Sequence, residues 1–600
     1  MTVISLRNQL KLLVTGAFFV FAPHWAPHIQ QVWGRNLFVT PDALTLLGAT
    51  ILVSLLGYYL LPAFSVAHAT SGVKDNLQPR RFNWARCLAV VFGLLSLVYV
   101  LYLVNQRILH SFLSSADEHS CYFLAECLRR GKLYVDIPPL ADFFQVVHVG
   151  MKGGKWFSVY PPGWPAIWAA GIHFNIADWL NPVMSALAIL FFYLAGIRLF
   201  APGVVACGLL VCALSPFFMF TAASYFSHGT CLLCISIFLY AFLRWREHYD
   251  KGNDPVGWAA LCGFAVGYGL MTRYLTMAAI AGPFLLYHYL PLFFEGSGWR
   301  YAFWGKIKIP VPVVKFKWRG LRKSDWILAA VVAVFMIMIL WQNYLVTGKP
   351  FKAPNKYDKS WERLGFKRGH YTPVDGFFFL ISRIFYLMDW FAPAFVGAYL
   401  CLLFNLRGLK RSSTTAAATL NDVPRTLFIL TPVFLAFAYV LYYSWGGNQW
   451  GPRYWWEGLP FLSVSVMAWL GQMWGRQGSK VKKFIAVFVA ASVITSGILF
   501  AKHAEFTEEA SRQRRALYDL AERTIDGPAI VFIKGFLGSR LVLAEEDAVR
   551  NSPFLDGRIL YAHDLGDRNR ELMTAYSGRA FYRGIYDRSV KQPTLKGLTT

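Results

Sequence analysis

The sequence predicts an all-α membrane protein that crosses the bilayer many times and ends in a small α/β module outside the membrane. Hydrophobic residues make up 56% of its 600 residues and charged residues only 15%, whereas a soluble chain of this length needs more charge to cover its surface. The apolar residues gather in continuous runs of about 20, the length that a transmembrane helix needs. After Ala501 this pattern changes to an amphipathic segment followed by short strand-like runs, AIVFIKG and RILYAHD.

The apolar runs are expected to form helices, because lipid offers the backbone no hydrogen-bond partners and barrel strands would be shorter and alternating. One further apolar segment, 161–175, contains Pro161, Pro162 and Pro165, which favours an interfacial or re-entrant helix. The N-terminus lacks a small-residue cleavage site and is interpreted as a retained first span. About thirteen spans are predicted, near 12–32, 43–66, 88–109, 178–198, 203–222, 229–244, 256–273, 277–294, 326–346, 380–404, 427–444, 456–474 and 484–500.

The distribution of Lys and Arg orients these spans. Four basic loops fall on one side of the predicted spans, and basic loops remain in the cytoplasm; they are 67–87, 295–325, 405–426 and 475–483. The loops 110–177 and 445–455 and the C-terminal segment are then expected outside. Loop 347–378 is also expected outside although it is basic, so either the topology differs there or its charges meet anionic groups. The net charge of +26 is attributed to loops beside anionic lipid, and no nucleic-acid partner is expected.

Two carboxylates, Asp117 and Glu118, lie directly beyond the apolar run that ends near Leu109. Carboxylates beside a membrane are costly to desolvate, which indicates function. An enzyme that activates a hydroxyl group needs a base of this kind within hydrogen-bond reach. The alternative is a helix end with solvated carboxylates, and the residues alone do not decide between the two.

Two arginines are candidates for binding an anion. Arg453 is the only charged residue of WGGNQWGPRYWW, and its planar guanidinium suits a lipid phosphate. The alternative is an interfacial arginine within an aromatic belt. Arg273, in LMTRYLT, has no acidic neighbour and therefore needs an anionic partner from elsewhere. His228, in SYFSHGT, also lies at an external span end, where a purely structural role is the alternative.

Nine cysteines are present, mostly within apolar runs where they serve as small buried hydrophobes. Cys121 and Cys127 share the proposed external loop and could form a disulfide, although their spacing alone does not decide this. No cluster with metal-ligand spacing occurs, so no metal site and no cofactor is assigned, and the sequence alone does not decide whether the reaction needs a metal.

Three segments resemble the GT-C superfamily of membrane glycosyltransferases. They are ADEHSCYFLAECLRRGKLYVDIPPLADFF, GGKWFSVYPPGWPA and GGNQWGPRYWWEGLPFL. The branch they resemble most is glycosyltransferase family 39, which includes protein O-mannosyltransferases and bacterial lipid A aminoarabinose transferases, over roughly residues 88–475. The resemblance implies an inverting transfer of a sugar from a polyprenyl-phosphate donor to an acceptor hydroxyl. It places this reaction at the outer face of the bacterial inner membrane, with a glycolipid, glycan or protein as the acceptor.

The resemblance also implies residue roles. The family's first-loop aspartate is the catalytic base, which here is Asp117, with Glu118 supporting it or contacting the acceptor. Relatives often carry a lysine just before the YPP segment, but this chain has Val159 there, so Lys155 is the nearest substitute. The residues expected to bind the donor phosphate are Arg453, Arg273 and Lys155. The residues expected to bind substrate are Tyr160, His228, Asn448 and Gln449.

The expected organisation has three parts. Residues 1–87 form a two-span N-terminal extension, 88–500 a GT-C-like catalytic domain with the external loop 110–177, and 501–600 an extracytoplasmic module. A transporter of lipid-linked or anionic cargo is one alternative, although few charges lie mid-span and no repeat is visible. A ligase or polymerase that uses a pyrophosphate-linked oligosaccharide is a second alternative, and a scaffold with a decayed site is a third.

Overall fold

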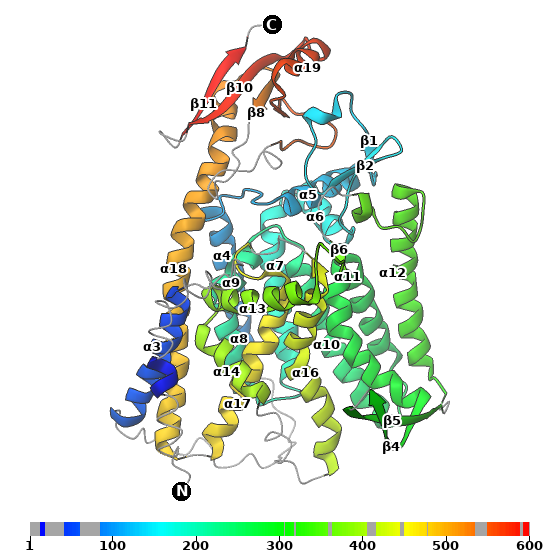
Figure 1. Ribbon diagram of the computed structural model, residues 1–600, viewed down its shortest axis with the longest axis vertical. Helices are drawn as coiled ribbons and strands as arrows, with labels where there is room; N and C mark the ends of the chain where they lie inside the picture. Colours follow the sequence, from blue (N-terminus) through cyan, green and yellow to red (C-terminus); the bar gives the residue numbers. More distant parts are fainter. Residues whose placement is uncertain are drawn as a thin grey trace.

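Long apolar helices form the body of the protein, and a small sheet at one end carries the C-terminus (Figure 1). The computed structural model describes residues 13–17, 41–60, 84–304, 307–316, 320–357, 363–404, 416–443, 449–476, 478–533, 549–587 and 592–598. Within these ranges, seven helices are long and apolar enough to cross a membrane. The predicted fold class, a polytopic helical membrane protein with a small C-terminal α/β module, is therefore confirmed.

The seven helices are α4 (Trp84–Arg107), α7 (Ala177–Gly196), α10 (His228–Asp250), α11 (Val256–Phe293), α12 (Lys323–Thr347), α16 (Ala416–Val440) and α18 (Ser479–Thr524). The helices α4 and α12 leave most of their apolar side chains exposed, as expected where a helix faces lipid. The helix α10 is mostly buried and lies at the centre of the bundle, between α7 and α11.

The helix α11 is a hairpin that bends at Arg273, whose backbone angles (φ −149°, ψ 83°) are not helical. In a straight helix, Gly269 and Met277 would lie about 12 Å apart, yet a Cβ atom on Gly269 would come within 2.7 Å of the Met277 sulfur. Val266 and Leu285 likewise line one groove beside α12. The two arms therefore run side by side, in agreement with the two predicted spans 256–273 and 277–294.

Two predicted spans are broken by proline. Segment 203–222 consists of α8 (Pro202–Ala213) and α9 (Pro216–Ala223), which are bent by 68° because Ser215 and Pro216 start a new helix. Segment 380–404 consists of α13 (Pro373–Trp390) and α14 (Pro393–Phe404). Phe391, two residues before Pro393, has an extended backbone and ends α13. Each of these two predicted spans therefore consists of two helices.

Three further parts of the bundle are α3 (Pro41–Leu60), the 3₁₀ helix η4 (Arg453–Gly458) and α17 (Leu459–Arg476). The helix α3 packs against α18, and it covers the predicted span 43–66 as far as Leu60. Most of the predicted span 12–32 lies outside the described residues.

The first loop folds at one end of the bundle, above the spans in Figure 1. Its elements are α5 (Ala116–Arg129), β1 (Val135–Asp136), η2 (Ala141–Phe143), β2 (Val149–Lys152), β3 (Lys155–Ser158) and α6 (Gly163–His173). The strands form an antiparallel sheet in the order β1-β3-β2. The helix α6 has 11 residues, about 16 Å, which is too short to cross a bilayer. It packs against α5, so the expected interfacial helix is present.

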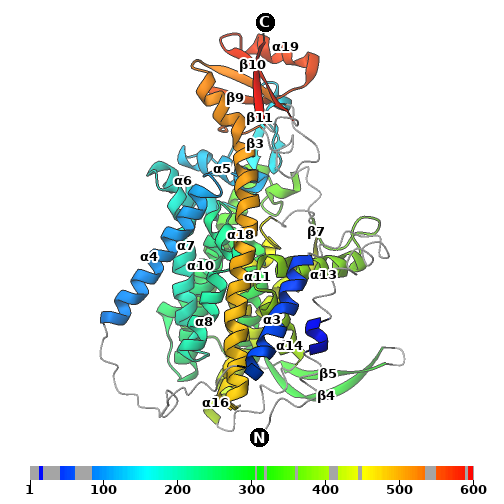
Figure 2. The same ribbon diagram turned by 90° about the vertical axis from the view of Figure 1, so that its left-hand side faces the viewer.

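The helix α18 is 46 residues long, continues out of the bundle and carries the C-terminal sheet (Figure 2). This sheet has the order β11-β10-β8-β9, with β8 parallel to both of its neighbours and β11 antiparallel to β10. The predicted strands AIVFIKG and RILYAHD correspond to two of its members. The elements are β8 (Ala529–Ile533), β9 (Ile559–His563), η6 (Gly566–Arg568), α19 (Asn569–Ala575), β10 (Ala580–Asp587) and β11 (Gln592–Leu598).

The C-terminal sheet lies against the first loop. Phe532 of β8 packs edge-to-face with Phe143, and Arg130 pairs with Asp556 at 2.5 Å. At the opposite end of the molecule lies the hairpin of β4 (Phe294–Trp304) and β5 (Ile307–Phe316), where α17 ends and α18 begins (Figure 1).

The described residues of basic loop 347–378 lie at the same end as the first loop, as expected. It contains η3 (Pro354–Tyr357) and β6 (Arg363–Leu364). The strand β6 pairs with β7 (Tyr442–Tyr443), which connects this loop to the chain that leads into η4.

Candidate active site

The helix α5 begins at a capping box that fixes the first carboxylates. The Ser115 side chain accepts a hydrogen bond from the Glu118 backbone, and the Glu118 carboxylate accepts one from the Ser115 backbone. Ser115-Ala-Asp-Glu118 is therefore a helix start as well as an acidic pair. The cap places Asp117 in the first turn, where the helix dipole favours a negative charge.

Glu118 does not face the cavity that Asp117 lines. Its side chain is 1% exposed and accepts backbone N–H groups of Ser114 (2.6 Å), Ser115 (3.1 Å) and Tyr225 (2.9 Å). Burial raises the pKa of Glu118 to about 7, although the N–H groups of Tyr225 and Ser114 favour the ionised form. The geometry does not support the predicted contact of Glu118 with an acceptor, because the backbone occupies both carboxylate oxygens. Glu118 instead joins α5 to the segment before α10.

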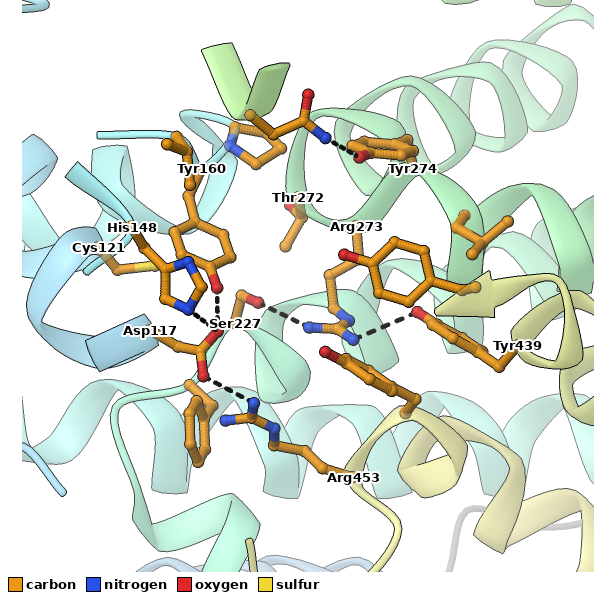
Figure 3. A pocket seen from close by; sticks show the side chains of 17 residues that line it. Asp117, Cys121, His148, Tyr160, Ser227, Thr272, Arg273, Tyr274, Tyr439 and Arg453 are labelled. Atoms are coloured by element: carbon orange, nitrogen blue, oxygen red, sulfur yellow. Dashed lines mark hydrogen bonds and ion pairs between the residues drawn. The ribbon is translucent and has the colours of Figure 1, made fainter. Parts of the chain in front are cut away.

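Asp117 is held from three sides. Arg453 donates to its Oδ2 at 2.7 Å, the Tyr160 hydroxyl donates to Oδ1, and His148 Nε2 lies 4.0 Å from Oδ1 (Figure 3). Burial opposes ionisation, but the charges of Arg453 and His148 and the Tyr160 hydrogen bond lower the pKa of Asp117 below its usual range. Asp117 is therefore ionised at neutral pH.

These groups line one cavity of about 110 Å³, which is room for more than a single water. Its walls come from α5, the ends of the first-loop sheet, the segment before α10, the bend of α11, η3, the end of α16, β7 and η4. The lining residues are Asp117, Cys121, His148, Val159, Tyr160, Pro161, Phe226, Ser227, Thr272, Arg273, Tyr274, Leu275, Asn355, Tyr439, Tyr442, Arg453 and Tyr454. The cavity thus brings together Asp117, Arg273, Arg453 and Tyr160 from the residues selected in the sequence.

Arg453 reaches this cavity from η4 and is 4% exposed. Its guanidinium lies 4.0 Å from the centre of the Phe226 ring, a cation–π contact, and one nitrogen bonds to Asp117. Its buried Nε and Nη1 atoms have no hydrogen-bond partner. Unpaired buried donors of a charged group cost free energy. The Arg453 guanidinium is therefore suited to bind an anion in addition to Asp117, by donating hydrogen bonds to it.

Arg273 occupies the bend of α11, which explains why a charge lies at the end of an apolar arm. Its Nη1 and Nη2 atoms make only long contacts, 3.4 Å to the Ser227 hydroxyl and 3.3 Å to the Tyr439 hydroxyl. Figure 3 shows this guanidinium directed into the cavity, opposite Asp117.

A third arginine, Arg383, was missed in the sequence. It comes from α13, is 4% exposed, and lies 5.7 Å from the centre of the Tyr454 ring. Arg273 and Arg453 lie at 5.7 and 5.9 Å from the same ring, so three guanidinium groups surround one tyrosine. A charge inside the predicted span 380–404 was the signal that pointed to it.

The other predicted site residues lie elsewhere. His228 is fully buried and bonds to Glu457 at 2.9 Å, so it is not a lining residue. Lys155 donates to the Leu345 carbonyl at 2.5 Å and stacks on Tyr134, away from the cavity lining. Gln449 bonds to the Ser114 carbonyl at 3.4 Å, and Asn448 lies outside the described residues.

The structure describes neither a disulfide nor a metal-binding cluster among the residues it covers. Cys121 and Cys127 are both free thiols, so the disulfide considered from the sequence is not formed. In the part of the chain that the structure describes, no three His, Cys, Asp or Glu side chains gather as a metal ion would require.

No protein-family model matches the chain, and no curated protein matches it significantly. The structure is similar to ArnT from Cupriavidus metallidurans in the apo state, at 14% identity over 84% of this chain and 94% of that chain, with a TM-score of 0.49. The same protein bound to undecaprenyl phosphate is 13% identical over 83% of this chain and 93% of that chain, with a TM-score of 0.47. The oligosaccharyltransferase AglB from Archaeoglobus fulgidus, in complex with an inhibitory peptide and a dolichol-phosphate, is 12% identical over 79% of this chain and 66% of that chain, with a TM-score of 0.39. At these identities and scores, the comparisons assign no residue a role.

Proposed function

We propose that this chain is an inverting glycosyltransferase that transfers a sugar from a polyprenyl-phosphate donor to an acceptor hydroxyl. The observation that supports this most directly is the shared cavity of Asp117, Arg273 and Arg453. An ionised carboxylate beside two guanidinium groups supplies a base for the acceptor and positive charge for a phosphate leaving group. The motif resemblance in the sequence favours the same reaction.

The chemistry begins at Asp117. The carboxylate takes the proton of the acceptor hydroxyl, and the oxygen attacks the anomeric carbon of the donor sugar. The bond between that carbon and the phosphate oxygen breaks, and polyprenyl phosphate leaves with the electron pair. Attack on the face opposite the leaving group inverts the anomeric configuration. Tyr160 and Arg453 orient the carboxylate through their bonds to its two oxygens.

The arginines stabilise the charge that develops on the leaving phosphate. Arg453 has two buried nitrogens without partners, and Arg273 makes only long contacts through Nη1 and Nη2. Both guanidinium groups are thus available for charge-assisted hydrogen bonds to phosphate oxygens, which are stronger than neutral ones. Arg383, behind Tyr454, adds positive charge to the same region.

The proposed partners are a polyprenyl-phosphate-linked sugar, an acceptor that is a glycolipid, a glycan or a protein, and the surrounding membrane lipid. The proposed location is the bacterial inner membrane, with the cavity facing the periplasm. The cavity lies at the end of the bundle opposite the basic β4–β5 hairpin, which the positive-inside rule assigns to the cytoplasm.

The test is donor turnover by purified protein in nanodiscs. A panel of polyprenyl-phosphate sugars is supplied with a membrane extract as the source of acceptor, and release of free polyprenyl phosphate is measured. Wild type is expected to turn over one donor, and Asp117→Asn is expected to be about 10²–10⁴-fold slower, the usual contribution of a general base. Equal turnover by the two proteins would remove Asp117 from the mechanism. Bound donor lipid without turnover of any donor would favour transport or ligation.

A further inference from the structure

Glu457 is a fully buried carboxylate next to the cavity, but it does not line it. It lies in η4, four residues after Arg453, and its side chain is 0% exposed. Glu457 Oε1 lies 2.9 Å from His228 Nδ1 and 3.3 Å from Arg273 Nε. One carboxylate therefore contacts two residues that the sequence singled out for substrate binding, and it reaches both from behind the cavity wall.

These contacts divide the guanidinium of Arg273 into two edges. The Nε atom faces Glu457 in the protein interior, whereas Nη1 and Nη2 face Ser227 and Tyr439 on the cavity wall. The pair of Nη atoms forms one of the two fork edges that can bind a phosphate with two parallel hydrogen bonds.

Among the contacts described here, Glu457 is the one opposite charge that Arg273 meets. Arg273 lies at the bend of α11, where its backbone angles are not helical. Its Nη contacts are 3.3 and 3.4 Å long, at the weak end of hydrogen bonding. The contact with Glu457 is an ion pair at 3.3 Å in which Arg273 Nε makes no hydrogen bond, so it restrains the side chain through charge. His228, itself 0% exposed, bonds to the same Oε1 atom and so holds the carboxylate in turn.

We propose that Glu457, held by His228, is a positioning residue that keeps the Nη edge of Arg273 turned toward the bound phosphate of the donor. This inference rests on the proposed function, because it assumes that a phosphate binds in the cavity. It gives the predicted residue His228 a role as a support of Glu457, without contact to substrate.

The need to orient Arg273 also explains why an ion pair, and not an apolar pair, is buried here. Burying an ion pair contributes little net stability, since an apolar pair of similar volume is often as stable. A charge pair at this depth is better explained by the fixed geometry that it gives to Arg273 than by stability.

The experiment measures undecaprenyl phosphate binding to the full-length protein in nanodiscs. Wild type is compared with Glu457→Leu, Glu457→Gln, Arg273→Met and the double variant Glu457→Leu/Arg273→Met. Glu457→Leu is expected to weaken binding about tenfold. Glu457→Gln keeps an acceptor oxygen without the charge and is expected to lose less. If Glu457 acts through Arg273, the double variant binds no more weakly than Arg273→Met alone, because coupled residues are non-additive.

A matched control comes from a second buried pair at the other end of the bundle. His288 Nε2 lies 2.8 Å from Asp325 Oδ1, and both side chains are 0% exposed. Asp325→Asn is expected to lower thermal stability while the folded protein keeps wild-type affinity for undecaprenyl phosphate. Should Glu457→Leu fail to fold, His228→Leu takes its place, with an expected loss of about threefold that disappears in the Arg273→Met background.

The outcomes separate this inference from the proposed function. Wild-type affinity in Glu457→Leu, or losses that add in the double variant, would overturn the positioning role while phosphate binding stands. Absence of undecaprenyl phosphate binding by wild type would overturn the proposed function and this inference with it.

Discussion

Asp117 is ionised because its neighbours outweigh its burial. The charge of Arg453 lies 2.7 Å from one carboxylate oxygen and the Tyr160 hydroxyl bonds to the other. A lowered pKa makes the carboxylate available at every physiological pH, but it also makes it a weaker base. A donor phosphate that draws Arg453 away would return basicity to Asp117 at the moment when the acceptor must be deprotonated.

Replacing Arg453 should therefore move the acid limb of the pH–rate profile. In wild type, the pKa of Asp117 lies below the usual range of an aspartate, so the carboxylate stays ionised in mild acid. We therefore expect kcat/KM to stay level down to about pH 4. In Arg453→Met the opposing effect of burial remains, so the residual activity is expected to fall at a higher pH. Residual kcat/KM measured from pH 4 to pH 8 checks this. An unchanged acid limb would show that Arg453 does not control Asp117.

Glu118 should make stability depend on pH in the opposite sense from a paired carboxylate. Its folded pKa of about 7 lies above the ordinary 4.5, so between these values the folded protein holds a proton that the unfolded chain has released. Its contribution to stability is complete below pH 4.5 and is lost as the pH rises to about 7. We expect the Tm in detergent to fall from pH 5 to pH 7 in wild type, and less steeply in Glu118→Gln. Equal slopes in both proteins would contradict this.

At the scale of secondary-structure elements, a close backbone contact at a glycine joins α6 to α11. Gly163, at the start of α6, packs against the bend of α11. A Cβ atom there would lie 2.4 Å from the Thr272 hydroxyl and 2.8 Å from the Met271 carbonyl. The Gly163 carbonyl also accepts a hydrogen bond from Tyr268 at 2.8 Å. The start of α6 and the bend of α11 are thereby held in contact.

Gly163→Ala should separate these elements. Forcing a methyl group into a packed contact costs about 1–3 kcal/mol, so we expect a lower Tm together with reduced donor turnover, since Arg273 moves with the bend. The control is Gly257→Ala, at the exposed start of α11, where no atom lies within 4 Å of the added methyl group. Wild-type Tm and turnover in Gly163→Ala would show that this contact does not position the site.

The sequence predicted elements better than it predicted their breaks. Hydropathy located the two arms of α11, but it could not show that Arg273 forms the turn between them, because the turn depends on tertiary packing. Prolines at 216 and 393 were visible, yet the apolar runs around them were interpreted as single spans. Asp117 and Glu118 were interpreted either as a catalytic pair or as a solvated helix end, and the capping box that takes Glu118 out of the cavity was not recognised.

At the scale of the whole molecule, the site depends on long-range assembly. Asp117 and Arg453 are 336 residues apart in the sequence and form a direct ion pair. The sequence selected both residues separately, but it contained no signal for Arg383 beyond a charge in an apolar run, and none for Glu457 as the partner of His228. These pairings follow from how α13, η4 and α10 pack together.

The arrangement of the ends predicts which face of the membrane each part meets. Ser577, on the C-terminal module, and Ser479, at the start of α18, are both exposed and lie at opposite ends of the molecule. An impermeant thiol reagent applied to intact cells should label Ser577→Cys above the background of the parent protein. Ser479→Cys should react only after the cells are permeabilised. The reverse pattern would invert the proposed orientation and place the cavity in the cytoplasm.

The central claim is that Asp117, Arg273 and Arg453 form one site for the phosphate of a polyprenyl donor. A cryo-electron microscopy structure of the wild-type protein in nanodiscs with undecaprenyl phosphate tests it most directly. The account predicts phosphate oxygens about 2.7–2.9 Å from guanidinium nitrogens of both arginines, the usual length of a charge-assisted hydrogen bond, on the side of the cavity that faces Asp117. A phosphate bound outside this cavity, with Arg453 still paired only to Asp117, would contradict it.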